Sequence, residues 1–158
     1  MKKLILAIGI VVFSTAAAQA QDASKSTTLS IAANVGIPTT TGLSLAYGGD
    51  LQADFGVAPT TKITASAGYE AYSVKGGGSS SGIIPLLGGV KFNLGDKAYA
   101  HGQLGYGVST AKGGSGSFAY APSLGYYVSR NFDASVKYLA FSNHGTLGSV
   151  NLRLAYNF

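Results

Sequence analysis

Residues 43–57 read Leu-Ser-Leu-Ala-Tyr-Gly-Gly-Asp-Leu-Gln-Ala-Asp-Phe-Gly-Val, and this stretch decides the fold. Its odd positions are mostly large and apolar, whereas its even positions carry mainly Ser, Gly, Asp and Gln. Because successive side chains of a β-strand point to opposite faces, this alternation predicts a strand with one apolar and one polar face. The stretch is far longer than the roughly 5–6 residues of an average globular strand. It exceeds the about 9–11 residues that a tilted strand needs to cross a bilayer.

The same alternation recurs along the chain, between clusters of Gly, Ser, Asn, Asp or Pro. Because backbone groups must be paired internally in lipid, a sheet that spans a membrane must close on itself. We therefore predict an all-β fold, an eight-stranded antiparallel up-and-down transmembrane β-barrel with short periplasmic turns. A soluble lipocalin- or avidin-like barrel is the alternative. The expected strands span residues 27–36, 43–57, 61–74, 82–94, 97–110, 116–129, 131–142 and 148–158.

The positions of the large aromatic residues favour the membrane barrel over the soluble one. If both chain ends face the periplasm, most Tyr and Phe residues fall into two belts on the apolar face, one near each end of the strands. Such belts are typical of residues at lipid interfaces, whereas a soluble core would place the rings near mid-strand. The expected membrane girdle consists of Tyr47, Phe55, Tyr69, Phe92, Tyr106, Phe118, Tyr120, Tyr126, Phe132, Tyr138, Tyr156 and Phe158.

The N-terminus has the organisation of an export signal. Residues 2–3 are both lysine, residues 4–13 form an apolar run, and residues 18–20 read Ala-Gln-Ala, a small-residue cleavage pattern. We expect residues 1–20 to be a cleaved signal peptide and residues 21–26 an N-terminal extension before the barrel domain at 27–158; a retained anchor is the alternative. Loss of the two lysines lowers the formal net charge from +5 to +3, so we expect no nucleic-acid partner.

Composition excludes several classes of protein. Only 11% of the residues are charged and the hydrophobic share is 46%, which argues against disorder. The absence of cysteine excludes disulfide scaffolds, thiolate metal sites and cysteine nucleophiles. Two histidines without a nearby carboxylate cluster make a poor metal site, so we expect no metal and no cofactor.

The charged residues of the strands predict what fills the barrel. Eight strands leave an interior just wide enough for side chains. Opposite charges in so narrow a space are expected to pair, because an unpaired charge removed from water is costly. We therefore expect a polar plug, with a narrow pore that passes small solutes as the alternative. Pro85 and Leu87 also point inward, and Pro85 could mark a bulge. The expected lumen charge network consists of Asp50, Asp54, Glu70, Asp133, Lys62, Lys91, Lys137 and Arg153, with His101 and Gln103 as further polar lumen residues.

Candidate catalytic chemistry is weak. Ser142 and His144 lie close together near the last outer loop, where a Ser/His pair could serve a lipid-modifying enzyme. They are local neighbours, however, and no acidic residue lies in an outer loop to orient the imidazole. The glycine-rich run at residues 76–82 lacks the Gly-Lys-Ser/Thr ending of a phosphate loop. We therefore predict no catalytic residues and no enzyme activity.

The C-terminus carries the most specific signal in the chain. Leu152, Leu154, Tyr156 and Phe158 occupy alternate positions and end in an aromatic residue. This pattern resembles the assembly signal of outer-membrane proteins, which in that family is read by the barrel-assembly machinery. The physical basis would be β-augmentation, in which an exposed strand pairs with the edge of a receptor sheet.

The chain resembles the small bacterial outer-membrane β-barrel proteins, a porin-family or OmpX/OmpA-like group. The resemblance rests on residues 118–126, 131–138 and 153–158, which read FAYAPSLGY, NFDASVKY and RLAYNF. It implies location in the cell outer membrane of a Gram-negative bacterium and contact with outer-membrane lipid. It also implies export and barrel-assembly machinery as partners during biogenesis. We expect a monomer with a structural or surface-interaction role, and a narrow porin-like channel is the alternative.

Overall fold

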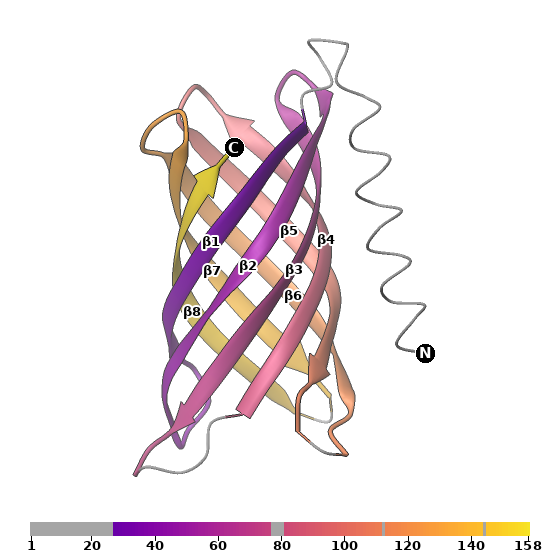
Figure 1. Ribbon diagram of the computed structural model, residues 1–158, viewed down its shortest axis with the longest axis vertical. Helices are drawn as coiled ribbons and strands as arrows, with labels where there is room; N and C mark the ends of the chain where they lie inside the picture. Colours follow the sequence, from indigo (N-terminus) through magenta and orange to yellow (C-terminus); the bar gives the residue numbers. More distant parts are fainter. Residues whose placement is uncertain (1–26, 77–80, 112, 144) are drawn as a thin grey trace.

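The computed structural model describes residues 27–76, 81–111, 113–143 and 145–158. In this part of the chain eight antiparallel strands form one closed barrel, in which each strand pairs with its sequence neighbours and β8 closes against β1. The strands run obliquely around the barrel (Figure 1), as closure of a sheet requires. The predicted fold is therefore confirmed. The strands are β1 (Thr27–Pro38), β2 (Leu43–Ala58), β3 (Thr61–Val74), β4 (Ser81–Leu94), β5 (Ala98–Ser109), β6 (Gly116–Tyr127), β7 (Phe132–Ser142) and β8 (Thr146–Asn157).

The predicted strand boundaries lie within two residues of the observed ones. The largest differences are at β1, which continues to Pro38, at β6, which ends at Tyr127, and at β8, which begins at Thr146. The expected signal peptide at residues 1–20 and the extension at residues 21–26 lie outside the described residues.

The two ends of the barrel differ in their connections. At one end, which we call the turn end, β2 joins β3, β4 joins β5 and β6 joins β7 through short segments, and the chain terminus Phe158 lies there too (Figure 1). Gly95 in the β4–β5 turn has a φ of 88°, a conformation that side chains other than glycine rarely adopt. At the opposite end, which we call the loop end, the remaining four connections join β1 to β2, β3 to β4, β5 to β6 and β7 to β8.

Two prolines interrupt the hydrogen-bonded ladders of the wall. Pro85 pairs with Gly107 of β5 and Pro122 pairs with Gly102 of β5. On their other sides, toward β3 and β7 respectively, the ladders skip these positions and resume in the same register. The expectation of a bulge at Pro85 is therefore wrong. A missing N–H removes a ladder bond without requiring an extra residue in the strand.

The two faces of the wall are sorted as the alternation predicts. In β2, Gln52 and Asp54 are buried inside, whereas Leu51 is 56% exposed on the outside. In β8, Asn151 and Arg153 are buried and Leu152 and Leu154 are exposed. Within the described residues no helix is long and apolar enough to span a bilayer. The side chains that fill the barrel are thus mostly polar, and the outer surface is mostly apolar.

Candidate functional site in the barrel lumen

The centre of the lumen is a cluster of charges from β2, β7 and β8. Arg153 donates from Nη2 to Asp50 Oδ1 at 2.8 Å and from Nε to Asp50 Oδ2 at 3.1 Å. Lys137 Nζ lies 3.3 Å from the same Oδ2, and Asn34 Nδ2 also donates to it at 3.1 Å. Gly68, which faces Asp50 in the register, leaves room for these long side chains because a Cβ there would crowd Asp50. One carboxylate thus receives two cations and one amide.

A second group of charges extends from this cluster toward the turn end. Lys91 Nζ lies 2.6 Å from Asp54 Oδ2 and 4.8 Å from the centre of the Tyr99 ring. The Tyr99 hydroxyl donates to Asp133 Oδ1 at 2.6 Å, and Arg153 Nη1 lies 3.6 Å from the same oxygen. The contacts therefore run without interruption from Asp54 through Lys91, Tyr99 and Asp133 to Arg153. Buried charges in this arrangement are mutually compensated.

The predicted polar residues His101 and Gln103 lie on the same inner surface of β5. His101 Nε2 and Thr64 Oγ1 are hydrogen-bonded at 2.8 Å, and Gln103 donates to Ser66 Oγ at 2.8 Å. Both partners belong to β3, which is not a neighbour of β5 in the sheet. These bonds therefore reach over the intervening β4 and hold the interior together.

Two predicted members of the charge network have no salt bridge among the described residues. Glu70 is 1% exposed, and its Oε1 atom has no hydrogen-bond partner. Lys62 is half-buried near the turn end, directly opposite Lys91 in the register. The two lie eight positions apart on β3, or about 26 Å at 3.3 Å per residue. The expectation that all eight charges pair is therefore wrong for Glu70 and Lys62. Equal numbers of positive and negative residues do not ensure that each charge lies at the same depth as a partner.

Toward the loop end, the lumen contains an apolar layer that the sequence interpretation missed. Tyr72, Leu139 and Phe141 are almost completely buried, and Ile83 and Leu87 pack with them. Phe141 fits there because its ring lies against Gly107, where a Cβ would collide with it. A signal was present: residues 83–87 and 138–141 are apolar on both faces. In these segments the alternation of polar and apolar residues fails, so the inner face is apolar as well.

The predicted membrane girdle lies on the outside of the barrel. Each of its twelve residues is half-buried or exposed, and the four remaining aromatic residues of the barrel, Tyr72, Tyr99, Tyr127 and Phe141, are on the inner face. At the turn end Phe132, Tyr156 and Phe158 form edge-on ring pairs with centroids 5.0 and 5.1 Å apart. Near the middle and loop end Tyr120 lies between Phe118 and Tyr138, at 6.4 and 6.1 Å.

The predicted assembly signal lies on the outer face of β8. Leu152, Leu154, Tyr156 and Phe158 are all exposed, from 37% to 75%. The strand that carries them closes the barrel, since it pairs with β7 on one side and β1 on the other. The Phe158 N–H donates to the Leu29 carbonyl of β1 at 2.9 Å. The last residue is therefore part of the seam at which the barrel closes.

The candidate residues for catalysis and metal binding are only partly within the described part of the chain. Among the described residues no group of three His, Asp or Glu side chains is placed to hold a metal ion. His144 lies outside the described residues, so the candidate pair of Ser142 and His144 stays a prediction. The neighbouring Asn143 donates from Nδ2 to the Gly116 carbonyl at 2.8 Å, which ties the last loop to β6. Chemically, the described lumen is a network of ion pairs and hydrogen bonds beneath an apolar layer, in which Asn34 Oδ1, Glu70 Oε1 and Asn151 Oδ1 are buried without a hydrogen-bond partner.

No protein-family model and no curated protein matches the chain in sequence. Solved structures match it in fold. Ail, the attachment invasion locus protein of Yersinia pestis, is similar at a TM-score of 0.62 and 17% identity, over 84% of this chain and 97% of Ail. The N-terminal β-barrel domain of Pseudomonas aeruginosa OprF is similar at a TM-score of 0.62 and 15% identity, over 85% of this chain and 99% of that domain.

A third similar structure is the outer membrane enzyme PagL, at a TM-score of 0.60 and 17% identity, over 80% of this chain and 98% of PagL. At such low identities the likeness concerns the fold, and one fold carries many functions. The chain therefore has the fold of the small eight-stranded transmembrane β-barrels of the outer membrane.

Proposed function

We propose that this chain is a non-enzymatic integral protein of the Gram-negative outer membrane, with a structural or surface-interaction role and a lumen closed to solutes. It is a monomer in the bilayer, exported through the signal peptide expected at residues 1–20 and assembled by machinery that reads Phe158 and the alternate positions before it. Location in the outer membrane is supported by the similar barrels, Ail, OprF and PagL among them.

The observation that carries the proposal is that two different barriers to permeation lie at successive depths of the lumen. The ion pairs of Asp50, Lys137 and Arg153 occupy one level, and the layer of Leu139 and Phe141 occupies another toward the loop end. A permeating ion would have to displace a paired charge from its partner and then enter an apolar layer without water. Each of these steps is costly in a medium of low dielectric constant.

The non-enzymatic part of the proposal rests on the sequence, in which no acidic residue of an outer loop is available to orient His144 beside Ser142. PagL is an enzyme with a similar fold. A narrow channel is the second candidate, and Glu70 favours it. Its buried carboxylate has no salt bridge among the described residues. It lies between the ion pairs and the apolar layer, where it would attract a cation.

Conductance across planar bilayers tests the proposal. The purified barrel is expected to give no steady ionic current. A double variant, Leu139→Gly with Phe141→Gly, removes two of the five large side chains of the apolar layer and leaves the residues of the ion pairs unchanged. The matched control is Leu51→Gly with Leu104→Gly, which removes two large apolar side chains from the outer face, where they are 56% and 60% exposed. A steady current through the wild-type barrel would contradict the closed lumen, and its loss in Glu70→Gln would establish the channel.

A further inference from the structure

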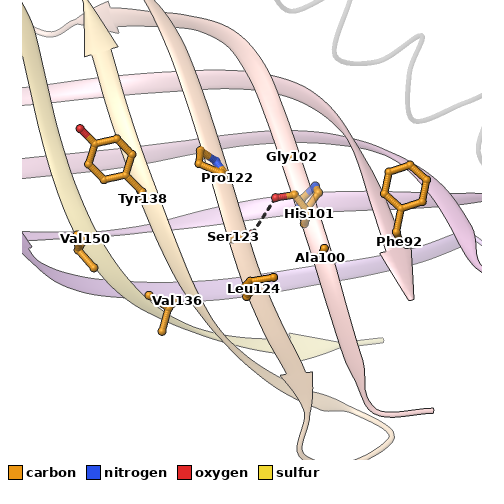
Figure 2. A pocket seen from close by; sticks show the side chains of 10 residues that line it. All are labelled: Phe92, Ala100, His101, Gly102, Pro122, Ser123, Leu124, Val136, Tyr138 and Val150. Carbon is orange, nitrogen blue, oxygen red and sulfur yellow. Dashed lines mark hydrogen bonds between the residues drawn. The ribbon is translucent and has the colours of Figure 1, made fainter. Parts of the chain in front are cut away.

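The outer surface of the barrel has a hollow where β5, β6 and β7 meet (Figure 2). Its volume is about 510 Å³. The floor consists of Ala100, Gly102 and Pro122, and larger side chains, chiefly Phe92, Leu124 and Tyr138, stand around it. We call this feature the β5–β7 hollow. All six side chains are on the outer face, so the hollow opens to the hydrocarbon of the membrane and not to the lumen.

The hollow is a built feature of the wall. Small residues occupy adjacent outward positions on two paired strands, since Gly102 faces Pro122 in the register. Pro122 also interrupts the ladder with β7, and the strands resume pairing on either side of that gap. Leu104, the next outward residue on β5, is a large side chain that is 60% exposed and therefore stands out from the wall. The floor is a local depression beside such larger side chains.

Two cationic side chains lie at the turn end below the hollow. Lys97 is in the β4–β5 turn and Arg130 is in the β6–β7 turn, and both are exposed. The Tyr127 N–H donates to the Lys97 carbonyl at 2.7 Å, which joins the end of β6 to the β4–β5 turn. Asp96 is the acidic residue of these turns, which leaves one net positive charge at their surface. Cationic groups at this level of a membrane protein attract lipid phosphates.

We infer that the β5–β7 hollow binds one acyl chain of a membrane glycerophospholipid whose phosphate lies at Lys97 and Arg130. The spacing fits this ligand. Ala100 and Gly102 are three and five residues beyond Lys97, or about 10 and 17 Å at 3.3 Å per residue. An acyl chain leaving a headgroup at the turn end would therefore reach the floor of the hollow within its own length.

A second copy of the barrel fits the hollow less well. The floor is enclosed by Phe92, Leu124 and Tyr138, which are large enough to keep a convex barrel wall away from Gly102. An acyl chain is narrow enough to lie between these side chains, and most of the residues that line the hollow are apolar.

Lipid retention measured by native mass spectrometry tests the inference. The purified barrel in detergent is titrated with dipalmitoyl phosphatidylglycerol, and the dissociation constant of the first bound lipid is determined. Gly102→Leu fills the hollow, because a Cβ at this position meets no atom within 4 Å. We expect it to weaken the first lipid by about tenfold, the effect of losing roughly two buried methylene groups. The matched control is Gly88→Leu on β4, which also faces lipid and whose Cβ would lie 3.8 Å from the Thr64 carbonyl oxygen.

The second arm tests the headgroup. Lys97→Gln with Arg130→Gln is expected to weaken phosphatidylglycerol, but not dipalmitoylglycerol, which has the same chains and no phosphate. Equal lipid affinity in the wild type and Gly102→Leu would overturn the inference, as would equal losses in Gly102→Leu and Gly88→Leu. A dimer that Gly102→Leu abolishes would identify a second copy as the occupant instead. The inference rests on the membrane location proposed above but not on the closed lumen, so its failure would leave the conductance result unaffected.

Discussion

The pair formed by Lys91 and Asp54 permits a quantitative prediction. Its two charged atoms are 2.6 Å apart and its side chains are 2% and 5% exposed. Lys91→Met keeps the length of the side chain and removes the charge, so Asp54 retains only the 2.6 Å hydrogen bond from Gln52. Removing one partner of a buried ion pair costs about 3–5 kcal/mol. Because the Gln52 bond remains, we expect the free energy of unfolding to fall by about 3 kcal/mol, at the lower end of that range.

The control is the lysine directly opposite. Lys62 faces Lys91 in the β3–β4 register, is half-buried and forms no salt bridge within the described part of the chain. Lys62→Met is therefore expected to change stability by less than about 0.5 kcal/mol. The double variant Lys91→Met with Asp54→Leu removes both buried charges, and it should be more stable than Lys91→Met alone by roughly 1–3 kcal/mol.

Urea unfolding of the barrel in lipid vesicles measures all of these variants, with heat-modifiable gel mobility to report the folded fraction. The reasoning is refuted if Lys91→Met costs no more than Lys62→Met, because the buried pair would then contribute nothing. It is also refuted if the double variant is no more stable than Lys91→Met alone, because the unpaired Asp54 carboxylate would then cost nothing.

Two further predictions concern single residues. Glu70→Gln should raise the free energy of unfolding by about 1 kcal/mol in the same urea assay. The change removes a buried charge that has no salt bridge among the described residues and keeps the shape of the side chain. A loss of stability would show that the carboxylate is compensated. Deletion of Phe158 should slow the appearance of the heat-modifiable form in pulse-chase labelling of cells. Deletion of Lys25, in the expected extension, is the control and should not slow it. Equal rates of appearance in the two variants would contradict the assembly signal.

The architecture could be predicted from the sequence because the side chains of a strand alternate with a fixed period. Gln52 and Asp54 had to share a face, and Leu51 and Ala53 the other, in any strand that included them. Once one face was identified as lipid-facing by Tyr47 and Phe55, the inner face of β2 followed. The even number of strands followed from placing both chain ends on the same side of the membrane, and the absence of a free sheet edge followed from closure.

The contacts inside the lumen could not be predicted in the same way. Alternation shows that Lys91 points inward, but Asp54 is on β2, which is not a neighbour of β4 in the sheet. Their contact depends on the tilt of the strands and the reach of each side chain, and neither is encoded in a local pattern. Glu70 and Lys62 show the same limit, since both point inward and lie too far apart to meet.

The apolar layer lies directly beside the ion pairs of the lumen. Leu139 and Phe141 are inward neighbours of Lys137 on one strand, so the apolar layer begins one position beyond the ion pairs. An ion pair is stronger where water is excluded, because the local dielectric constant is low. On the loop side of Lys137, the buried side chains of Leu139 and Phe141 take up space that water would otherwise fill. The failure of alternation at residues 138–141 therefore has a physical role, since it covers the charges that alternation places below it.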